Sequence, residues 1–310
     1  MSKVVALGGG HGLAATLTAL RQVTQEITAI VTVADNGGSS GRLREEFPIF
    51  PPGDLRMALA ALCADDEWGR TWAQIMQHRF VSNGELNGHA MGNLLLASMW
   101  NAGDDPVVAL DRVGDLLKVI GRVLPMAAVA LDIEGTFTTS TGRIVVRGQK
   151  EVATVKGYIE SLRIIPEDPE ARPEALAAIS AAEWITMGPG SWFSSVIPHL
   201  LVPAQLEALK SSKAKKILIL NLDASSRSQG EEFAGSTPEQ HLEFFHRYAP
   251  GLTVDYCLVD QSVVRDEVAL REAASTLGSE IVIADIRKAP GSIHHDAEKL
   301  ALHLGHILRK

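Results

Sequence analysis

Short apolar runs alternate with segments of helical periodicity along most of the chain. Five runs have no polar face, and they lie at residues 4–7, 27–34, 184–187, 217–222 and 281–284. Between the first two, Leu13, Leu17 and Leu20 fall on one helical face. Strands without a polar face are typical of a parallel sheet that helices cover on both sides. The pattern therefore predicts an α/β fold.

Residues 129–157 interrupt this alternation. Residues 136–141 and 143–147 read as strands, and the Thr-Gly pair at their junction suits a hairpin turn. We therefore expect a small antiparallel β sub-region here. Helices are expected at residues 57–80, 86–121, 174–182 and 196–201. Because no linker-like stretch divides the chain, the pattern predicts a single domain over residues 1–310, with the β-rich sub-region inserted near 129–157.

Composition and charge narrow the classes of function. The chain has 310 residues, of which 46% are apolar and 21% charged, as in ordinary folded proteins. Its net charge of −8 argues against extended nucleic-acid contact, which requires clustered Lys and Arg. Cys63 and Cys257 form no CxxC motif, so we expect neither a zinc site nor a disulfide framework. No apolar run reaches the ~18 residues that a membrane-spanning helix needs. We expect a cytoplasmic protein that binds no nucleic acid and does not insert into a membrane.

The first candidate site is the turn Gly-Gly-Gly-His-Gly at residues 8–12, between a predicted strand and a predicted helix. Such a turn lets backbone N–H groups and a helix N-terminus face an anion. Leu13 occupies the last glycine position of a dinucleotide GxGxxG fingerprint, and no Walker Gly-Lys-Ser/Thr follows. A tight turn without a ligand is the alternative, but four glycines in five residues exceed what one turn needs. The expected phosphate contacts are Gly9, Gly10, His11 and Gly12.

The second candidate site spans residues 35–42. Asp35 follows the second predicted strand, where an acid can hydrogen-bond a ribose hydroxyl. The glycines and serines after it offer amides and hydroxyls, and Arg42 and Arg44 could pair with phosphate. A flexible surface loop is the alternative, but it gives no reason for an acid, an amide and two arginines to cluster. The expected contacts are Asp35, Asn36, Gly37, Gly38, Ser39, Ser40 and Arg42.

Two weaker motifs follow at residues 51–56 and 88–93. Asp54 suits the N-cap of the next helix, and it could also contact a metal or a hydroxyl, with Arg56 on a phosphate. Asn93 could read a base or sugar edge. His89 could act as an acid or base, although a single histidine at a helix start is more often a structural hydrogen-bonder.

A second strand–glycine–helix junction lies at residues 188–195. Gly188, Gly190 and Ser191 could contact a phosphate, and the serines of this stretch could instead cap the next helix. The stretch lacks the GxSxG elbow of serine hydrolases.

Histidines near the C-terminus raise the question of a metal site. His294 and His295 precede a predicted helix that carries His303 and His306. Adjacent side chains on a strand point in opposite directions, so the first two would not readily share a metal. His303 and His306 share a helix face, and we expect them to be solvated surface histidines. The only candidate metal contacts elsewhere are Asp35 and Asp54.

These motifs, in this order, resemble the CofD/YvcK family, most closely its YvcK branch. They are Gly-Gly-Gly-x-Gly at 8–12, Val-Ala-Asp-x-Gly-Gly-Ser-Ser-Gly-Arg-Leu-Arg at 33–44, Pro-Gly-Asp-Leu-Arg at 52–56, Gly-Asn-Leu-Leu at 92–95, Gly-Pro-Gly-Ser at 188–191 and Ile-Pro-His-Leu-Leu-Val-Pro at 197–203. The resemblance covers nearly the whole chain. It implies a Rossmann-like three-layer fold, with a parallel sheet between two layers of helices.

The resemblance also implies two functions. CofD moves a phospholactyl group from a guanosine diphosphate donor to a deazaflavin, with magnesium. The YvcK branch comprises gluconeogenesis factors associated with cell shape and envelope synthesis, which are implied to bind UDP-sugars, notably UDP-N-acetylglucosamine. By matching motif, the nucleotide site would be lined by Gly9, Gly10, Gly12, Asp35, Gly38, Ser39, Asn93, Gly190 and Ser191.

The sequence departs from the family pattern at four places. His11 replaces a usual threonine, and Asn36 replaces a usual aspartate, which weakens the case for a magnesium-dependent transferase. Residues 221–231 replace a shorter Pro-Gly-Glu stretch, and His294 replaces an arginine and its fixed charge. Arg287 or Arg265 could compensate for that charge. We retain Asn221 and His294 as expected ligand contacts.

Two hypotheses therefore remain. The first is a regulator that binds a UDP-sugar or another nucleotide diphosphate, forms a homo-oligomer and acts on an unidentified regulatory protein partner. The second is a CofD-like transferase, with Mg²⁺ as its candidate cofactor. A third, an NAD-dependent oxidoreductase, is disfavoured by Leu13.

Overall fold

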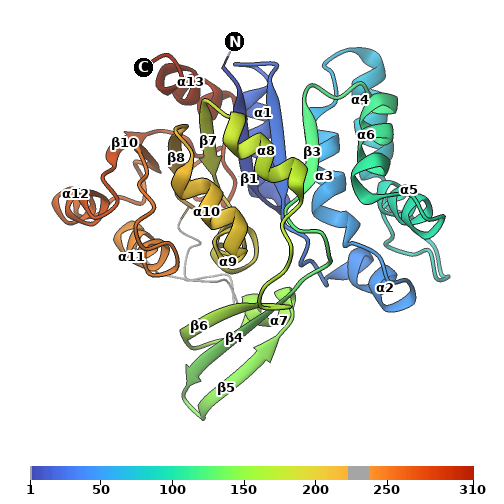
Figure 1. The fold of residues 1–310 in the computed structure, drawn as a ribbon, viewed down its shortest axis with the longest axis horizontal. Helices are drawn as coiled ribbons and strands as arrows, with labels where there is room; N and C mark the ends of the chain where they lie inside the picture. The colour runs from blue at the N-terminus through green and yellow to red at the C-terminus, as the bar shows by residue number, and fades with distance from the viewer. Residues whose placement is uncertain (1, 223–236) are drawn as a thin grey trace.

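The central sheet has seven parallel strands in the order β10-β9-β8-β7-β1-β2-β3 (Figure 1). The computed structural model describes residues 2–222 and 237–310. The strands are β1 (Val4–Gly8), β2 (Ile27–Val31), β3 (Arg122–Pro125), β7 (Trp184–Met187), β8 (Lys215–Ile219), β9 (Tyr256–Asp260) and β10 (Glu280–Ala284). The chain runs outward from β1 in one direction and from β7 in the other, so the order reverses between these two neighbours. In open parallel sheets, ligands bind at the carboxyl ends of the strands at such a reversal.

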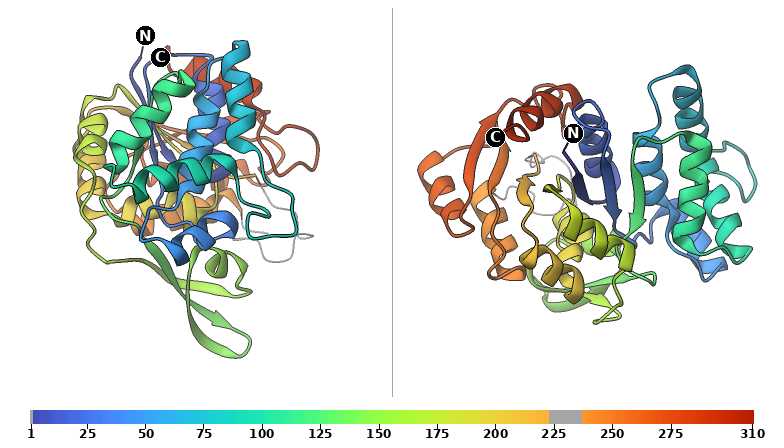
Figure 2. Two further views of the ribbon diagram at one scale, coloured as in Figure 1. Left: turned by 90° about the vertical axis from the view of Figure 1, so that its right-hand side faces the viewer. Right: turned by 45° about the horizontal axis from the view of Figure 1, so that its top comes forward.

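Helices cover both faces of the sheet, which confirms the predicted three-layer α/β fold (Figures 1 and 2). On one face, α1 (Gly10–Leu20) packs against α3 (Pro52–Leu62) and α13 (Ala297–Ile307). On the other, α8 (Pro173–Ala181) packs against α10 (Pro203–Ser211). The remaining α-helices of the main body in the described part of the chain are α2 (Gly38–Glu46), α4 (Glu67–Gln77), α5 (Met91–Asn101), α6 (Pro106–Leu117), α9 (Pro198–Leu201), α11 (Pro238–Tyr248) and α12 (Glu267–Ser275).

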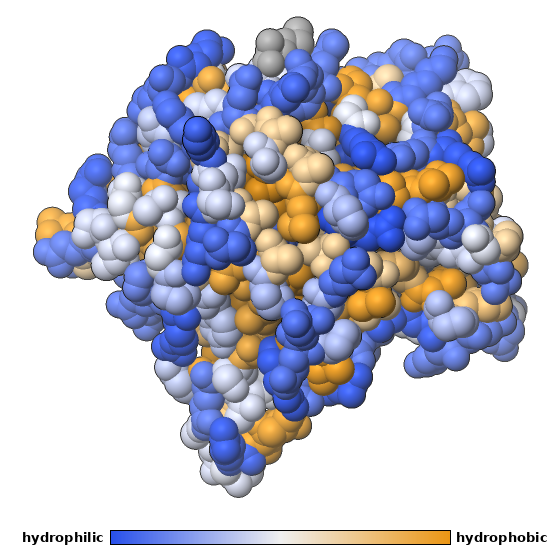
Figure 3. Space-filling view, viewed as in Figure 1, coloured by the Kyte–Doolittle hydropathy of each residue, from blue (hydrophilic) through white to orange (hydrophobic). Residues whose placement is uncertain are grey.

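The surface pattern agrees with these layers. Figure 3 shows apolar residues gathered over α8 near the centre of this face, with polar residues around them. None of the helices in residues 2–222 and 237–310 combines the length and apolarity that crossing a bilayer requires.

Some predicted element boundaries are wrong. Residues 57–80 and 86–121 each contain two helices, because Asp66 and Asp105 accept hydrogen bonds from backbone N–H groups and so begin α4 and α6. The apolar pattern misses β3 and β9, which are short and carry polar residues at their ends. It also misses α2, which begins within residues 35–42, the stretch for which a flexible surface loop was the alternative to a ligand site.

The predicted antiparallel sub-region is present and projects from the body (Figure 1). It consists of β4 (Asp132–Thr139), β5 (Gly142–Arg147) and β6 (Tyr158–Ile165) in the order β5-β4-β6, with helix α7 (Gln149–Thr154) between the last two in sequence. Its third strand extends the sub-region beyond the expected limit near residue 157. It is attached to the body by Phe137, whose ring lies 6.5 Å from that of Phe193, and by Leu162 N, which donates to Tyr248 Oη at 2.6 Å.

Candidate functional site

A pocket of about 350 Å³ opens at the carboxyl ends of β1, β7 and β8, beside the reversal in strand order. It is lined by Gly9, Gly10, His11, Gly12, Ala15, Asp54, Gln149, Gly190, Ser191, Ser194, Ser195, Asn221, Ile293, His294 and His295. The expected contacts among them are Gly9, Gly10, His11, Gly12, Asp54, Gly190, Ser191, Asn221 and His294. The structure thus brings together candidates from opposite ends of the chain.

The β1–α1 turn forms the first wall of the pocket. Gly9 is the N-cap residue of α1, in an extended conformation. A Cβ on Gly9 would lie 2.5 Å from Asp54 Oδ2, and one on Gly12 would overlap the carbonyl oxygen of Pro189. The two glycines therefore let the turn pack against the start of α3 and the loop after β7. Because an eleven-residue helix begins here, its N-terminus favours an anion in the pocket.

His199 holds this turn from inside the protein. Its Nε2 lies 3.2 Å from the carbonyl oxygen of Gly8, and its Nδ1 lies 2.8 Å from Gln205 Nε2. Since the Gln205 amide donates to Nδ1, Nε2 carries the proton and donates to Gly8. Burial lowers the pKa of His199 to about 4, so the ring is neutral at physiological pH.

The loop after β7 forms the second wall. It leads into the π-helical turn η1 (Trp192–Val196) and then α9, instead of the single helix expected at 196–201. Ser191 caps η1, because its Oγ accepts hydrogen bonds from Ser194 N at 3.2 Å and Ser194 Oγ at 2.6 Å. The capping interpretation is therefore correct for Ser191. Ser191, Ser194 and Ser195 all line the pocket.

The third wall comprises Asn221 and residues 293–295. Burial lowers the pKa of His295 to about 4. A hydrogen bond to the carbonyl of Leu220 acts to raise this pKa but does not offset the effect of burial. From residue 223 on, the stretch noted at 221–231 lies outside the described residues.

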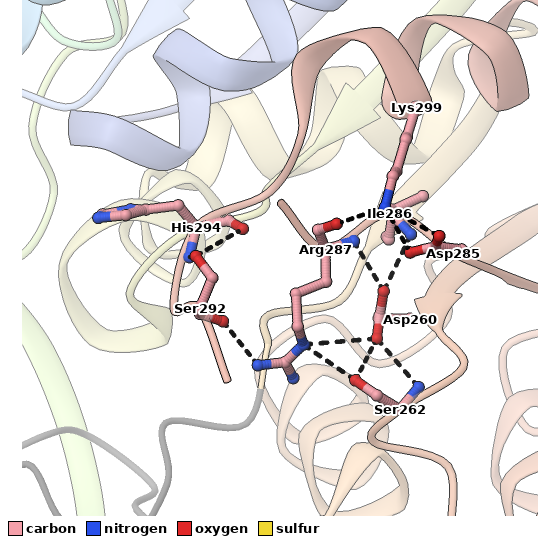
Figure 4. Close-up of polar contacts among 8 residues, drawn as sticks. All are labelled: Asp260, Ser262, Asp285, Ile286, Arg287, Ser292, His294 and Lys299. Atoms are coloured by element: carbon pink, nitrogen blue, oxygen red, sulfur yellow. Dashed lines mark hydrogen bonds and ion pairs between the residues drawn. The ribbon is translucent and has the colours of Figure 1, made fainter. Parts of the chain in front are cut away.

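Asp260 fixes the loop that carries this third wall (Figure 4). Its Oδ2 accepts from the backbone N–H groups of Ile286 at 2.9 Å and Arg287 at 2.8 Å, and its Oδ1 accepts from Ser262 N at 2.9 Å. Burial alone would raise the pKa of Asp260, but the bonds from Ser262 and Ile286 outweigh it and hold that pKa below its ordinary value. Arg287 donates to the Ser292 carbonyl at 2.6 Å and does not line the pocket. The expectation that Arg287 supplies the positive charge missing at His294 therefore has no support.

Asp54 is the buried acid of the pocket. It is not an N-cap residue, because α3 begins at Pro52. Its carboxylate accepts from Thr32 Oγ1 at 3.1 Å and from the Gly10 N–H. Burial, together with the charge of Asp35, raises the pKa of Asp54 to about 7. A neutral or half-ionised carboxyl group therefore lies beside the turn at physiological pH.

Asp35 and Asp54 are neighbouring acids, and only Asp54 lines the pocket. Mg²⁺ is commonly held by one or two carboxylates together with phosphate oxygens and water, and a cation would relieve the repulsion between these two acids. Nowhere in the described residues, this pair included, is a group of three or more His, Cys, Asp or Glu side chains arranged to hold a metal. The C-terminal histidines accordingly form no metal site within this part of the chain.

Ser39, Arg56 and Asn93 bond to one another and do not line the pocket. Ser39 Oγ accepts from Asn93 Nδ2 at 3.0 Å and lies 3.0 Å from His89 Nδ1, while Arg56 Nε donates to Asn93 Oδ1 at 2.8 Å. This buried network joins α2, α3 and α5. His89 thus has the structural role that was the alternative to acid–base chemistry, and ligand contact by the other three stays a prediction.

Other expected contacts also have partners within the protein. Ser40 Oγ accepts from Gly53 N at 3.0 Å, and Arg42 donates to the carbonyl oxygens of Glu85 at 3.1 Å and Asn87 at 2.7 Å. Gly188 N donates to the carbonyl of Leu7. Gly37 and Gly38 begin α2, outside the lining of the pocket.

Asn36 connects the β2–α2 loop to the inserted sub-region. Its Nδ2 donates to Glu151 Oε2 at 2.7 Å, and its Oδ1 accepts from Lys150 N at 3.1 Å. Both polar atoms of the amide are therefore engaged by α7. The neighbouring Gln149 does line the pocket, and nothing in its local sequence indicated this.

The pocket is rich in imidazole. The rings of His11 and His294 lie 6.3 Å apart. Burial lowers the pKa of His11, and the nearby charges of His294 and Arg56 lower it further. His11 is therefore neutral at pH 7 in the absence of an anion.

Replacing Asp54 with Asn should change how stability depends on pH. Since folding raises the pKa of Asp54, this group stabilises the fold most below its unfolded pKa and loses that contribution as the pH rises through about 7. Between pH 5 and 8.5, urea unfolding should show the parent losing free energy of unfolding that Asp54→Asn retains. The exposed Asp168→Asn variant is the control and should follow the parent. If the free energy of unfolding depended on pH in the same way in all three proteins, the raised pKa of Asp54 would be contradicted.

Asp260→Asn should destabilise the protein more than Asp285→Asn. In Asp260→Asn, an amide N–H group would face the Ser262 N–H and hydroxyl or the backbone N–H groups of residues 286–287, all of which are donors. The loss of a buried charged acceptor costs about 1.5–3 kcal/mol. Asp285 is exposed and pairs with Lys299 at 2.8 Å, which is worth less than about 1 kcal/mol. Denaturant unfolding of both variants measures the difference, and equal losses would refute it.

The comparisons with known proteins identify the family of this chain. A family model described as 2-phospho-L-lactate transferase CofD matches residues 4–298. A Mycobacterium tuberculosis protein named "Putative gluconeogenesis factor" is 49% identical over 96% of this chain and 88% of its own, and the Bacillus subtilis "Gluconeogenesis factor" is 34% identical over 99% and 98%. A crystal structure of a UPF0052 family protein from Bacillus halodurans superposes with a TM-score of 0.85 at 35% identity, covering 97% of this chain and 98% of that one. The chain therefore belongs to the CofD family, within the branch whose members are named gluconeogenesis factors.

Proposed function

We propose that this protein is a cytoplasmic gluconeogenesis factor that binds a nucleoside diphosphate sugar of the UDP-N-acetylglucosamine type. In this proposal the bound sugar nucleotide regulates cell shape and envelope synthesis through a protein partner. The observation that carries the proposal is the β1–α1 turn, which brings the start of α1 and three serines to one pocket. Its volume of about 350 Å³ falls within the usual range for small-molecule sites.

The diphosphate would occupy the centre of the pocket. There the first N–H groups of α1 other than that of Gly10, which donates to Asp54, and the hydroxyls of Ser191 and Ser195 would supply donors from two sides. Among the described lining residues, histidines are the only source of positive charge. An anion beside His11 would favour its protonated form, so binding is supported by backbone donors, with imidazole adding charge when it takes up a proton.

Titration calorimetry tests the proposal with three ligands. UDP-N-acetylglucosamine and UDP should both release or absorb heat and raise the melting temperature. Uridine, which lacks the diphosphate, should bind at least about tenfold more weakly, because the α1 N-terminus and the serines would have no anion to contact. The absence of heat and of a thermal shift at millimolar UDP-N-acetylglucosamine would refute the UDP-sugar form.

A CofD-like transferase is the second candidate, and the Asp35–Asp54 pair favours it. In that case the two carboxylates would hold Mg²⁺, which supplies charge neutralisation for a diphosphate donor, while the serines and the α1 N-terminus orient that donor. Both carboxylates would be ionised in that case, so the cation would take the place of the proton that burial favours on Asp54.

Mass spectrometry separates the two candidates. We expect no transfer product when the protein is incubated with a nucleotide-activated phospholactyl donor, Mg²⁺ and a deazaflavin acceptor, because the second aspartate of the family pattern is Asn36 and that amide is engaged by α7. Turnover that Asp54→Ala abolishes would establish the transferase instead.

A further inference from the structure

The two ends of the pocket differ in chemistry. Toward β8, Ile293 and the rings of His294 and His295 present apolar and aromatic surface beside the amide of Asn221. Toward β2, Asp54 and Gln149 present a carboxyl and an amide. The phosphate-binding turn lies between them, because β7 and β1 lie between β8 and β2 in the sheet. A flat base suits the first end, and a group rich in hydroxyls or amides suits the second.

Gln149 is fixed in the backbone and free in the side chain. On one side of it, Gly148 N donates to the carbonyl of Ile133 at 2.7 Å, and on the other, Lys150 N donates to Asn36 Oδ1 at 3.1 Å. Within residues 2–222 and 237–310, no side-chain or backbone group hydrogen-bonds to the Gln149 amide. A donor and an acceptor are therefore held at the pocket without an internal partner.

Asn36 and Glu151 determine where α7 lies. A Cβ on Gly148, whose φ is +112°, would lie 2.5 Å from Asn36 Nδ2 and closer still to Glu151 Oε2. The backbone at Gly148 thus packs directly on the Asn36–Glu151 hydrogen bond. Val152, one turn further along α7, is buried, and α7 contacts η1. The position of Gln149 therefore depends on a bond between residues 115 positions apart.

We propose that Gln149 determines specificity at this site by hydrogen-bonding the uncharged glycosyl group attached to the diphosphate, and that Asn36 is a positioning residue that holds Gln149 through Glu151. The inference rests on the proposed function, since it assigns one end of the same pocket. An amide can donate to a hydroxyl or carbonyl oxygen and accept from a hydroxyl or N–H, as a neutral sugar requires. The adjacent acids Asp35 and Asp54 disfavour a glycosyl group that carries a carboxylate.

The measured quantity is the ratio of the dissociation constant of UDP to that of UDP-N-acetylglucosamine. Gln149→Ala should leave UDP affinity within about twofold and lower this ratio about 3- to 10-fold, the loss of one hydrogen bond. The control is Gln74→Ala, because Gln74 is exposed on α4, away from the pocket, and its removal should leave both affinities unchanged. UDP-glucuronate should bind the parent no better than UDP.

Asn36 is tested by rescue. Asn36→Asp places a carboxylate against Glu151 and should lower the ratio as Gln149→Ala does, although Asn36 does not line the pocket. Adding Glu151→Gln restores a donor–acceptor pair with the roles reversed, and should restore the ratio. Glu151→Gln alone should leave the ratio near that of the parent, because its amide oxygen can still accept from Asn36.

The outcomes separate the two proposals. A ratio unchanged in Gln149→Ala, or equal losses for UDP and UDP-N-acetylglucosamine, overturns the role of Gln149 while the proposed function stands. A lowered ratio in Asn36→Asp that Glu151→Gln does not restore overturns the positioning role. A parent protein that binds neither ligand overturns the proposed function, and this inference with it.

Discussion

The pocket depends on how closely three loops approach one another at the carboxyl edge of the sheet. Gly9 touches Thr32 and Asp54, and Gly12 touches the carbonyl of Pro189, at distances that leave no room for a Cβ. These contacts hold the start of α1 between the ends of β2 and β7. Without them the serines after β7 and the acid of α3 would not face the same space. Packing therefore requires these glycines as much as any ligand does. The presence of four glycines in five residues is accordingly weaker evidence for a ligand than it was from the sequence alone.

The same close packing explains the electrostatics of Asp54. The turn buries this carboxyl beside Asp35 and offers it two donors, Thr32 and the Gly10 N–H. The donors lower its pKa, but burial and the neighbouring charge raise it by more. A buried acid that ionises near neutral pH is expensive for stability and is typical of functional sites. Its location beside the β1–α1 turn gives the pocket a group whose charge depends on pH near neutrality.

The sequence predicts the parts of this structure that local patterns encode. The apolar runs identify β1, β2, β7, β8 and β10, and the glycine turns at 8–12 and 188–191 lie at the pocket as expected. Local patterns could not show that Ser39, Asn93 and Arg56 bond to each other, because each belongs to a different helix. Each residue type suits a ligand equally well when its partners are unknown. Only the fold reveals the hydrogen bonds from Arg56 to Asn93 and from Asn93 to Ser39.

Asn36 and Gln149 illustrate the same limit from opposite directions. Asn36 lies in a motif full of ligand-binding residue types, yet both of its polar atoms bond to α7. Gln149 lies in an unremarkable segment after an exposed hairpin, yet it reaches the pocket. The connection between them joins the loop after β2 to the inserted sub-region. Under the proposed function, a scaffold that fixes the diphosphate with backbone groups would change its glycosyl partner through the insertion alone, while the glycine turns stay as packing requires them.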